Sequence, residues 1–198
     1  FGQLFHPGRE MLDSFDGSAP VSYAPSAVPN ERFHITPTPM SSEHIARVIE
    51  GFGDGARRLR EAGLDGAELV ASHGYLLSQF LNPRTNLRDD EYGGDLDRRL
   101  RFLREVIADV RAKVGHDFAL GLRISADERC YDGMTGDEVE TICRILSADE
   151  GLDYFSVVAG SSSTLAGSIH IVPPMTLKAG YIAPYAARIR EAVDRPVI

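Results

Sequence analysis

The apolar residues of this chain recur with two spacings that alternate along the sequence. A spacing of three and four residues, typical of amphipathic helices, covers residues 45–59, 97–114, 135–146 and 181–193. Short strand-like runs cover Gly66–Val70, Phe118–Ile124 and Tyr154–Val158, while Gly2–Phe5 ends an earlier strand and Pro196–Ile198 opens a later one. Strict alternation of buried strands with helices predicts a parallel sheet covered by helices.

Two folds satisfy this alternation, a doubly wound sheet and a (β/α)8 barrel. A dinucleotide-binding doubly wound sheet carries G-x-G-x-x-G at its first strand–helix turn, and the sequence has no such motif. A complete barrel needs about 250 residues and eight strands, whereas the pattern here gives five strands. The expected fold is therefore α/β, a partial (β/α)8 TIM barrel from about strand 3 to the start of strand 7. We interpret residues 1–198 as one domain truncated at both ends.

The composition of the chain excludes several classes of partner. Apolar residues make up 43% of the chain and charged residues 25%, an ordinary globular balance, and the net charge of −8 argues against a nucleic-acid surface. No apolar stretch reaches the roughly 20 residues that a membrane span needs. Cys130 and Cys143 are the only cysteines, and their spacing fits neither a disulfide framework nor a metal site. We expect a cytoplasmic protein with a small-molecule substrate and no metal, nucleic-acid or membrane partner.

In a barrel, functional residues gather at the C-terminal ends of the strands. Arg123 alternates with the apolar Leu122 and Ile124, so it should face the barrel interior near that end. A buried guanidinium needs either a protein carboxylate or an electron-rich ligand. The residues alone leave both a structural ion pair and a ligand contact open.

Two further strand ends carry polar side chains. His73 and Tyr75 follow the strand at Gly66–Val70 and place a hydrogen-bond donor beside a weak acid. Gln3 and His6 lie at the end of the first strand. Spacing alone does not distinguish any of the four from ordinary loop residues.

Three blocks of sequence resemble the old yellow enzyme family of flavin oxidoreductases. They are Gln3–Arg9 with the following Ala24–Ala27, the long run His73–Phe102, and Gly121–Ser125. They occur in the family's order, and the resemblance covers essentially the whole chain. Ile171–Met175 is similar to the subfamily of 2,4-dienoyl-CoA reductase, bile-acid enoate reductases and trimethylamine dehydrogenase. Members of that subfamily carry a 4Fe-4S cluster and FAD in further C-terminal regions.

The resemblance implies FMN as cofactor and assigns roles to individual residues. Gln3 matches the amide that binds the pyrimidine edge of FMN, and Arg123 matches the cation beside flavin N1 and O2. Tyr75 matches the acid that protonates the substrate α-carbon, and His73 matches one of two residues that hold the substrate carbonyl. The other holding position falls on Val70, where the simple ene-reductases have His. Val70 donates no hydrogen bond, so the two-pronged carbonyl clamp of those enzymes cannot form.

The function that the resemblance implies is reduction of an activated carbon–carbon double bond in an enoate, enone or enoyl thioester, with hydride from reduced flavin and NAD(P)H as electron donor. A flavin-dependent amine dehydrogenase or demethylase is the alternative. A third interpretation is an inactive fragment that lacks the FMN phosphate site, because in such barrels the loops after strands seven and eight hold that phosphate. The open sheet edges of a partial barrel also leave homo-oligomer formation open.

Most of the other polar residues have structural interpretations. The run from Asn82 to Phe102 should hold its loop through ion pairs and backbone hydrogen bonds. For Arg9 and His6 two interpretations stay equally open: a direct contact with the flavin, or a structural role in shaping its pocket. His170 is expected to be a solvated loop residue, and Ser161–Ser163 are candidates for lining the pocket.

Overall fold

A curved sheet of four parallel strands forms the centre of the computed structural model, which describes residues 1–11 and 21–198. The strands are β1 (Gly2–Leu4), β4 (Gly66–Ala71), β5 (Ala119–Ser125) and β6 (Tyr154–Val158), adjacent in that order. A parallel bridge from Phe155 to Val197 continues the series at the end of the chain. Consecutive parallel neighbours with helical crossovers are the arrangement of a barrel wall. The fold is α/β and covers part of a TIM barrel.

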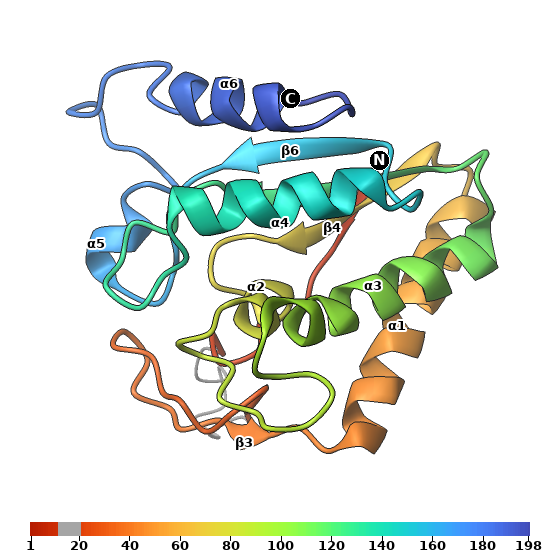
Figure 1. The fold of residues 1–198 in the computed structure, drawn as a ribbon, viewed down its shortest axis with the longest axis horizontal. Coiled ribbons are helices and arrows are strands. Elements are labelled where there is room, and N and C mark those ends of the chain that lie inside the picture. Colours follow the sequence, from red (N-terminus) through yellow and green to blue (C-terminus); the bar gives the residue numbers. More distant parts are fainter. Residues whose placement is uncertain (12–20) are drawn as a thin grey trace.

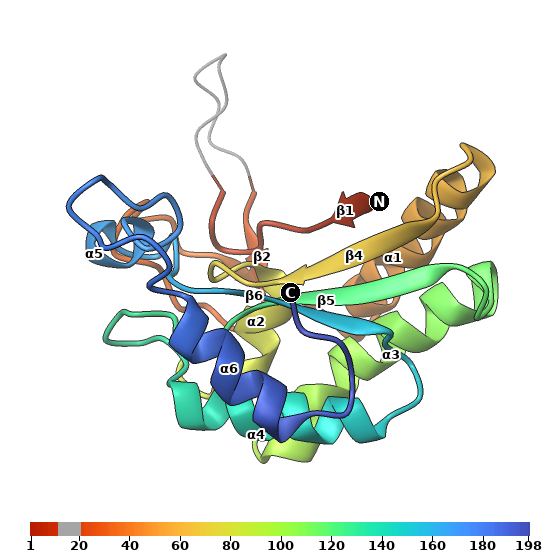
Figure 2. The same ribbon diagram turned by 90° about the horizontal axis from the view of Figure 1, so that it is seen from above.

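Four longer helices cover one side of the sheet, α1 (Ser42–Glu61), α3 (Leu96–Val114), α4 (Gly136–Ala148) and α6 (Ala183–Ala192) (Figures 1 and 2). Local sequence fixes where they begin. Ser41 accepts a hydrogen bond from the backbone N–H of His44, Asp95 accepts one from Arg98, and Thr135 forms a capping box with Glu138. Two short helices, α2 (Leu76–Leu81) and α5 (Leu165–Ser168), follow strands β4 and β6. A small second sheet pairs β2 (Tyr23–Ala24) with β3 (Thr38–Pro39).

The hydrophobic core lies between the sheet and its helices. Five large strand residues that point toward the helices have no exposed surface: Leu69, Leu120, Leu122, Ile124 and Phe155. Alternate residues of the same strands point to the opposite, inner side of the sheet. That inner side carries the polar groups, as described below.

Most element boundaries agree with the expected ones to within a residue or two. The helix expected over 181–193 runs only from Ala183 to Ala192. The strand expected from Phe118 begins at Ala119, because the carbonyl of Phe118 accepts a hydrogen bond from Arg111 Nη1 instead of joining the sheet. Helix α2 was not expected, because all six of its residues are buried and leave no polar face to reveal a helical period. No helix among the described residues is long and apolar enough to cross a membrane.

Candidate functional site

The inner side of the sheet carries a row of polar residues around Glu68. In the strand register Gln3 pairs with Glu68, Glu68 with Gly121, and Gly121 with Tyr154. Gln3 Nε2 donates to Glu68 Oε1 at 2.7 Å, and the Tyr154 hydroxyl donates to Glu68 Oε2 at 3.2 Å. A Cβ on Gly121 would lie 2.0 Å from Tyr154 Cζ. Glycine at 121 therefore makes room for the Tyr154 ring to reach the carboxylate.

A second row lies one step nearer the C-terminal ends of the strands. Val70, Arg123 and Ser156 are register partners there. Arg123 Nη1 donates to Ser156 Oγ at 3.0 Å and lies 3.6 Å from Glu68 Oε1. The expected inward direction of Arg123 is confirmed. The ion pair that the sequence left open is present, yet 29% of the Arg123 side chain stays exposed on the inner side.

His73 and Tyr75 are placed by a turn directly after β4. His73 and Gly74 have φ values of 61° and 79°, two successive residues in the left-handed region. Ser125 Oγ accepts from the His73 N–H at 2.9 Å, and the Ser162 N–H donates to the His73 carbonyl at 2.9 Å. A side chain at 74 is excluded, since a Cβ there would lie 2.4 Å from Ser161 Oγ. Strand β5 and the loop after β6 thus supply the groups that hold this turn.

The turn brings the two candidate catalytic rings together. Their centroids are 5.9 Å apart and the rings are nearly perpendicular, while the centroid of the Phe5 ring lies 5.2 Å from that of Tyr75. Burial, and secondly the charge of Arg123, lowers the pKa of His73 to about 4, so the imidazole is neutral at physiological pH. Its buried Nδ1 has no hydrogen-bond partner among the described residues. Burial, and then the negative charge of Glu10, raises the pKa of Tyr75.

The site therefore joins residues that are far apart in the sequence. Gln3 and Arg123 meet through Glu68, and His73 lies close enough to Arg123 for the charge to affect its pKa. Sequence reasoning missed Glu68 and Tyr154. Glu68 had a detectable signal, because it is the single charged residue in an apolar strand and shares the phase of Val70.

Other polar residues near the site serve the loops. Arg9 is buried, donates to the carbonyls of Val28 and Pro29, and pairs with Asp132 at 2.8 Å, so it shapes the loops. In the long run after Asn82, ion pairs and backbone hydrogen bonds form as expected; they include Asn86 to the Phe80 and Tyr92 carbonyls, Arg88 to Asp90, and Arg99 to the Leu81 carbonyl.

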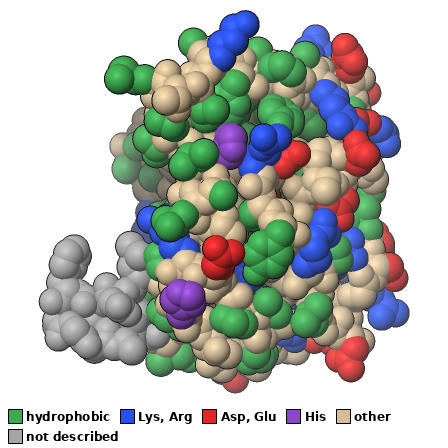
Figure 3. Space-filling model, turned by 90° about the vertical axis from the view of Figure 1, so that its left-hand side faces the viewer, with side chains coloured by type: hydrophobic (Ala, Val, Ile, Leu, Met, Phe, Trp, Pro, Cys, Tyr) green, Lys and Arg blue, Asp and Glu red, His purple; other side chains and the backbone are tan. Residues whose placement is uncertain are grey.

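The loops after β5 and β6 form an open hollow of about 600 Å³, lined by Arg129, Cys130, Tyr131, Ile169 and His170 among others; none of the candidate residues named above lines it. His170 is half-buried, and its Nδ1 has no partner within the described ranges, so it is less solvated than expected. Figure 3 faces this end of the molecule, where apolar side chains are spread among histidines and scattered charges. Among residues 1–11 and 21–198, no cluster of His, Cys, Asp or Glu is arranged to hold a metal ion.

The inner side of the sheet fits a flavin by the chemistry of its donors. A reduced flavin carries negative charge on its pyrimidine portion, and Arg123 offers a partly exposed cation there. The exposed Gln3 amide offers both a donor and an acceptor, as the edge of a pyrimidine ring requires. The His73 imidazole is partly exposed and makes no ring-nitrogen hydrogen bond among the described residues, so it leaves a polar group for a substrate.

Comparison with known proteins identifies the family. The model of the NADH:flavin oxidoreductase / NADH oxidase family matches residues 1–198. The chain belongs to this family. It is 39% identical over 197 residues to an N,N-dimethylglycine/sarcosine dehydrogenase of Chromohalobacter salexigens, and 36% identical over 196 residues to a multifunctional alkene reductase/demethylase of Caballeronia cordobensis. These alignments cover 99% and 98% of this chain but only 28% of either relative.

Solved structures of the family share the fold. Histamine dehydrogenase from Rhizobium sp. 4-9 superposes with a TM-score of 0.83 at 28% identity, over 98% of this chain and 28% of that one. Morphinone reductase superposes with a TM-score of 0.74 at 25% identity, over 98% of this chain and 53% of that one. The family thus includes proteins named for alkene reduction and proteins named for amine oxidation. The family also implies FMN and NAD(P)H as its redox partners.

Proposed function

We propose that the protein to which this chain belongs is an FMN-dependent oxidoreductase that reduces a carbon–carbon double bond conjugated to a carbonyl group. The observation that carries the proposal is the pair at the turn after β4. A neutral, partly exposed imidazole there makes no ring-nitrogen hydrogen bond among the described residues, and its neighbour is a half-buried tyrosine. Such a pair suits a substrate that needs one hydrogen bond and one proton.

The residues divide the chemistry between them. When bound, FMN supplies the hydride that adds to the β-carbon, and NAD(P)H restores its electrons. His73 donates an N–H to the carbonyl oxygen and so polarises the alkene. Tyr75 gives its hydroxyl proton to the α-carbon, and the resulting phenolate is reprotonated from solvent. Arg123 and Gln3 bind the pyrimidine portion of the flavin, where the cation favours the reduced form.

Val70 defines how this site differs from the simple ene-reductases. It pairs in register with Arg123 and is 5% exposed, so an apolar side chain occupies the position of the second carbonyl-binding residue. Of the two carbonyl-binding positions, 70 and 73, only His73 can then donate a hydrogen bond to the substrate carbonyl. We infer a preference for carbonyls that are already activated, such as enones and enoyl thioesters.

Oxidation of a secondary or tertiary amine is the second candidate. The observation in its favour is a group of aromatic rings: the centroids of the Phe5 and His73 rings lie 5.2 and 5.9 Å from that of Tyr75. Aromatic faces attract organic cations, and two of the related proteins are named as amine dehydrogenases. A 4Fe-4S cluster and FAD in C-terminal regions, and a homo-oligomer, stay predictions.

The two candidates predict opposite results with two substrates. The flavoprotein, reduced with NAD(P)H under anaerobic conditions, is mixed with a cyclic enone, and the oxidised flavoprotein is mixed separately with N-methylated amines. We expect rapid flavin reoxidation by the enone and slow or no flavin reduction by the amines. Fast reduction by an amine together with no reaction of the enone would overturn the proposal in favour of amine oxidation.

A further inference from the structure

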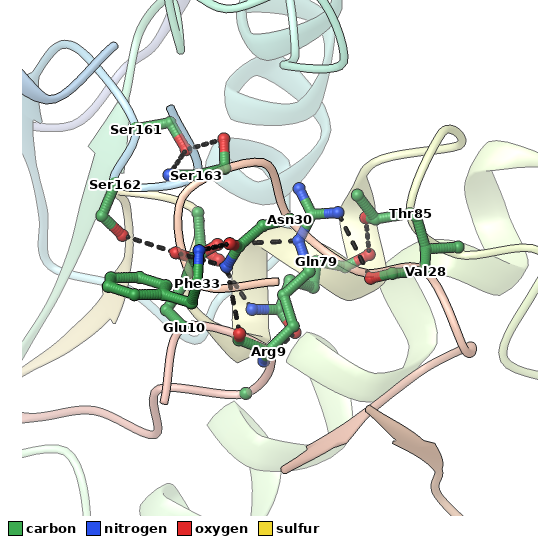
Figure 4. A network of polar contacts seen from close by, with 12 residues as sticks. Arg9, Glu10, Val28, Asn30, Phe33, Gln79, Thr85, Ser161, Ser162 and Ser163 are labelled. Carbon is green, nitrogen blue, oxygen red and sulfur yellow. Dashed lines mark hydrogen bonds and ion pairs between the residues drawn. The ribbon is translucent and has the colours of Figure 1, made fainter. Parts of the chain in front are cut away.

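A buried carboxyl group lies directly behind the turn that holds His73 and Tyr75. The side chain of Glu10 is only 1% exposed. Its Oε2 accepts hydrogen bonds at 3.0 Å from Asn30 Nδ2 and at 3.0 Å from Ser162 Oγ (Figure 4). Its Oε1 has no hydrogen-bond partner among the described residues and lies 3.6 Å from Arg9 Nε. An incompletely bonded carboxyl at this depth is expensive as an anion.

Glu10 touches the turn in two ways. Ser162 Oγ, which contacts the Glu10 carboxyl, also lies 2.9 Å from the His73 carbonyl oxygen. On the other side, Glu10 Oε1 would be 3.4 Å from a Cβ placed on Gly74, so it packs against the backbone of the turn. Glu10 is therefore coupled both to the backbone that fixes His73 and to the position from which Tyr75 emerges.

The charge of Glu10 also acts on Tyr75 through space. A negative charge nearby disfavours the phenolate and so makes the phenol a weaker acid. Among the described charged groups, Arg32 acts on Tyr75 in the opposite sense. The proton that Tyr75 delivers to substrate should thus leave more readily when Glu10 is protonated.

We propose that Glu10 is a positioning residue for the His73–Tyr75 turn, and that gain or loss of its proton tunes the strength of Tyr75 as a proton donor. The inference rests on the proposed function, because a proton donor is needed only if an alkene is reduced. The pKa of Glu10 supports it. Burial raises that pKa to about 7, against the opposing effects of Arg9, Ser162 and Asn30. Both protonation states are then populated near neutral pH.

Other titratable or charged groups around Glu10 also bear on the pH dependence near neutral pH. Arg9 faces its Oε1, and Asp132 pairs with Arg9 at 2.8 Å. Glu128 is a second buried carboxyl whose pKa is raised by burial, and its charge raises that of Glu10. His73, with a pKa of about 4, is already neutral in this range, and burial lowers the pKa of His6 as well. Glu128 is thus the group that a control must separate from Glu10.

The test uses the FMN-loaded protein with tyrosine labelled at 13Cζ. The Tyr75 resonance is assigned by its loss in Tyr75→Phe and followed from pH 5.5 to 8.5. We expect an inflection near pH 7 that disappears in Glu10→Gln and persists in the control Glu128→Gln, moved to slightly lower pH. In the same range the rate of enone reduction should fall roughly three- to tenfold as Glu10 ionises. In Glu10→Gln the rate should change less than about twofold over this range.

Each result decides the proposal. The proposal is overturned if the Tyr75 resonance of the wild-type protein shows no inflection, or if the inflection persists in Glu10→Gln. It is also overturned if the resonance shows the inflection but the rate of enone reduction does not change over the same pH range. If Glu10→Gln does not fold, Ser162→Ala replaces it. Removing that hydrogen bond destabilises the ionised carboxylate, so the inflection must move to higher pH, and an unmoved inflection counts against Glu10. If the wild type reduces no enone but the resonance behaves as expected, the proposed function fails while the coupling of Glu10 to Tyr75 stands.

Discussion

The two sides of the same strands differ in how their side chains interact: one side packs apolar residues, and the other forms polar contacts. On the helix side, Leu69, Leu122 and Phe155 are fully buried and belong to the hydrophobic core. On the inner side, Glu68 and Arg123 hold a network of hydrogen bonds and one ion pair that leaves the cation partly exposed. One residue along a strand separates a side chain that stabilises the fold from a side chain available to a ligand.

The difference teaches that stability and function can be tested separately in this sheet. Apolar burial is non-directional and depends on volume, whereas the inner network depends on which donor meets which acceptor. Substitutions on the helix side should change the free energy of unfolding and leave the chemistry intact. Removal of a single functional group at the turn after β4, such as the hydroxyl of Tyr75, should do the reverse.

The largest effect is expected from Tyr75→Phe. Loss of the hydroxyl removes the proposed proton donor and should slow enone reduction by roughly 10²–10⁴-fold, the usual contribution of a general acid. Tyr75 is half-buried, and no hydrogen bond of its hydroxyl is present among the described residues, so unfolding should be little affected. Stopped-flow measurement of both half-reactions checks this. Flavin reduction by NAD(P)H serves as the internal control, and enone reduction at the wild-type rate would remove Tyr75 from the mechanism.

On the helix side, Leu122→Ala should destabilise the fold without altering the reaction. Leu122 has no exposed surface, and truncation of a buried leucine costs about 2–5 kcal/mol through lost burial and the cavity that remains. Urea unfolding of the variant measures the loss. Leu87→Ala is the matched control, because Leu87 is 65% exposed and its truncation should cost less than about 0.5 kcal/mol. Equal losses in the two variants would contradict the assignment of the core to this side.

The comparison also explains how far the sequence could be interpreted. Strands and helices could be predicted because burial on one side imposes a period on each element, and the alternation around Leu122 placed Arg123 inward. Helix α2 lacked such a period because it is buried on every side. The resemblance to the family suggested roles for Gln3, His73 and Tyr75, which spacing alone left indistinguishable from loop residues.

The partners of these residues could not be predicted in the same way. Glu68 and Tyr154 are 86 residues apart in the sequence, and their contact depends on the register of three strands. Glu10 follows the recognised segment Gln3–Arg9 directly and looks like an ordinary loop acid. Only the folded chain buries it between Asn30 and Ser162. Contacts that depend on register or loop packing have no period in a single sequence.

The smallest effect tests whether Arg123 serves the flavin or only its ion pair. Arg123→Leu removes a partly exposed cation and leaves Glu68 without its counter-ion, and both changes disfavour extra negative charge on the inner side. We expect a midpoint potential lower by roughly 20–40 mV, which corresponds to about 1–2 kcal/mol for a two-electron couple.

Two control variants separate the charge of Arg123 from its ion pair. Arg123→Lys should keep a midpoint potential close to that of the wild type, because it keeps the charge. In the double variant with Glu68→Gln the unpaired carboxylate is gone, so only the loss of the cation remains and part of the shift should be recovered. Redox titration against a reference dye measures all four proteins. A potential that is unchanged in Arg123→Leu would assign Arg123 to the pair with Glu68 alone, and the inner side would then need another cation to favour the reduced flavin.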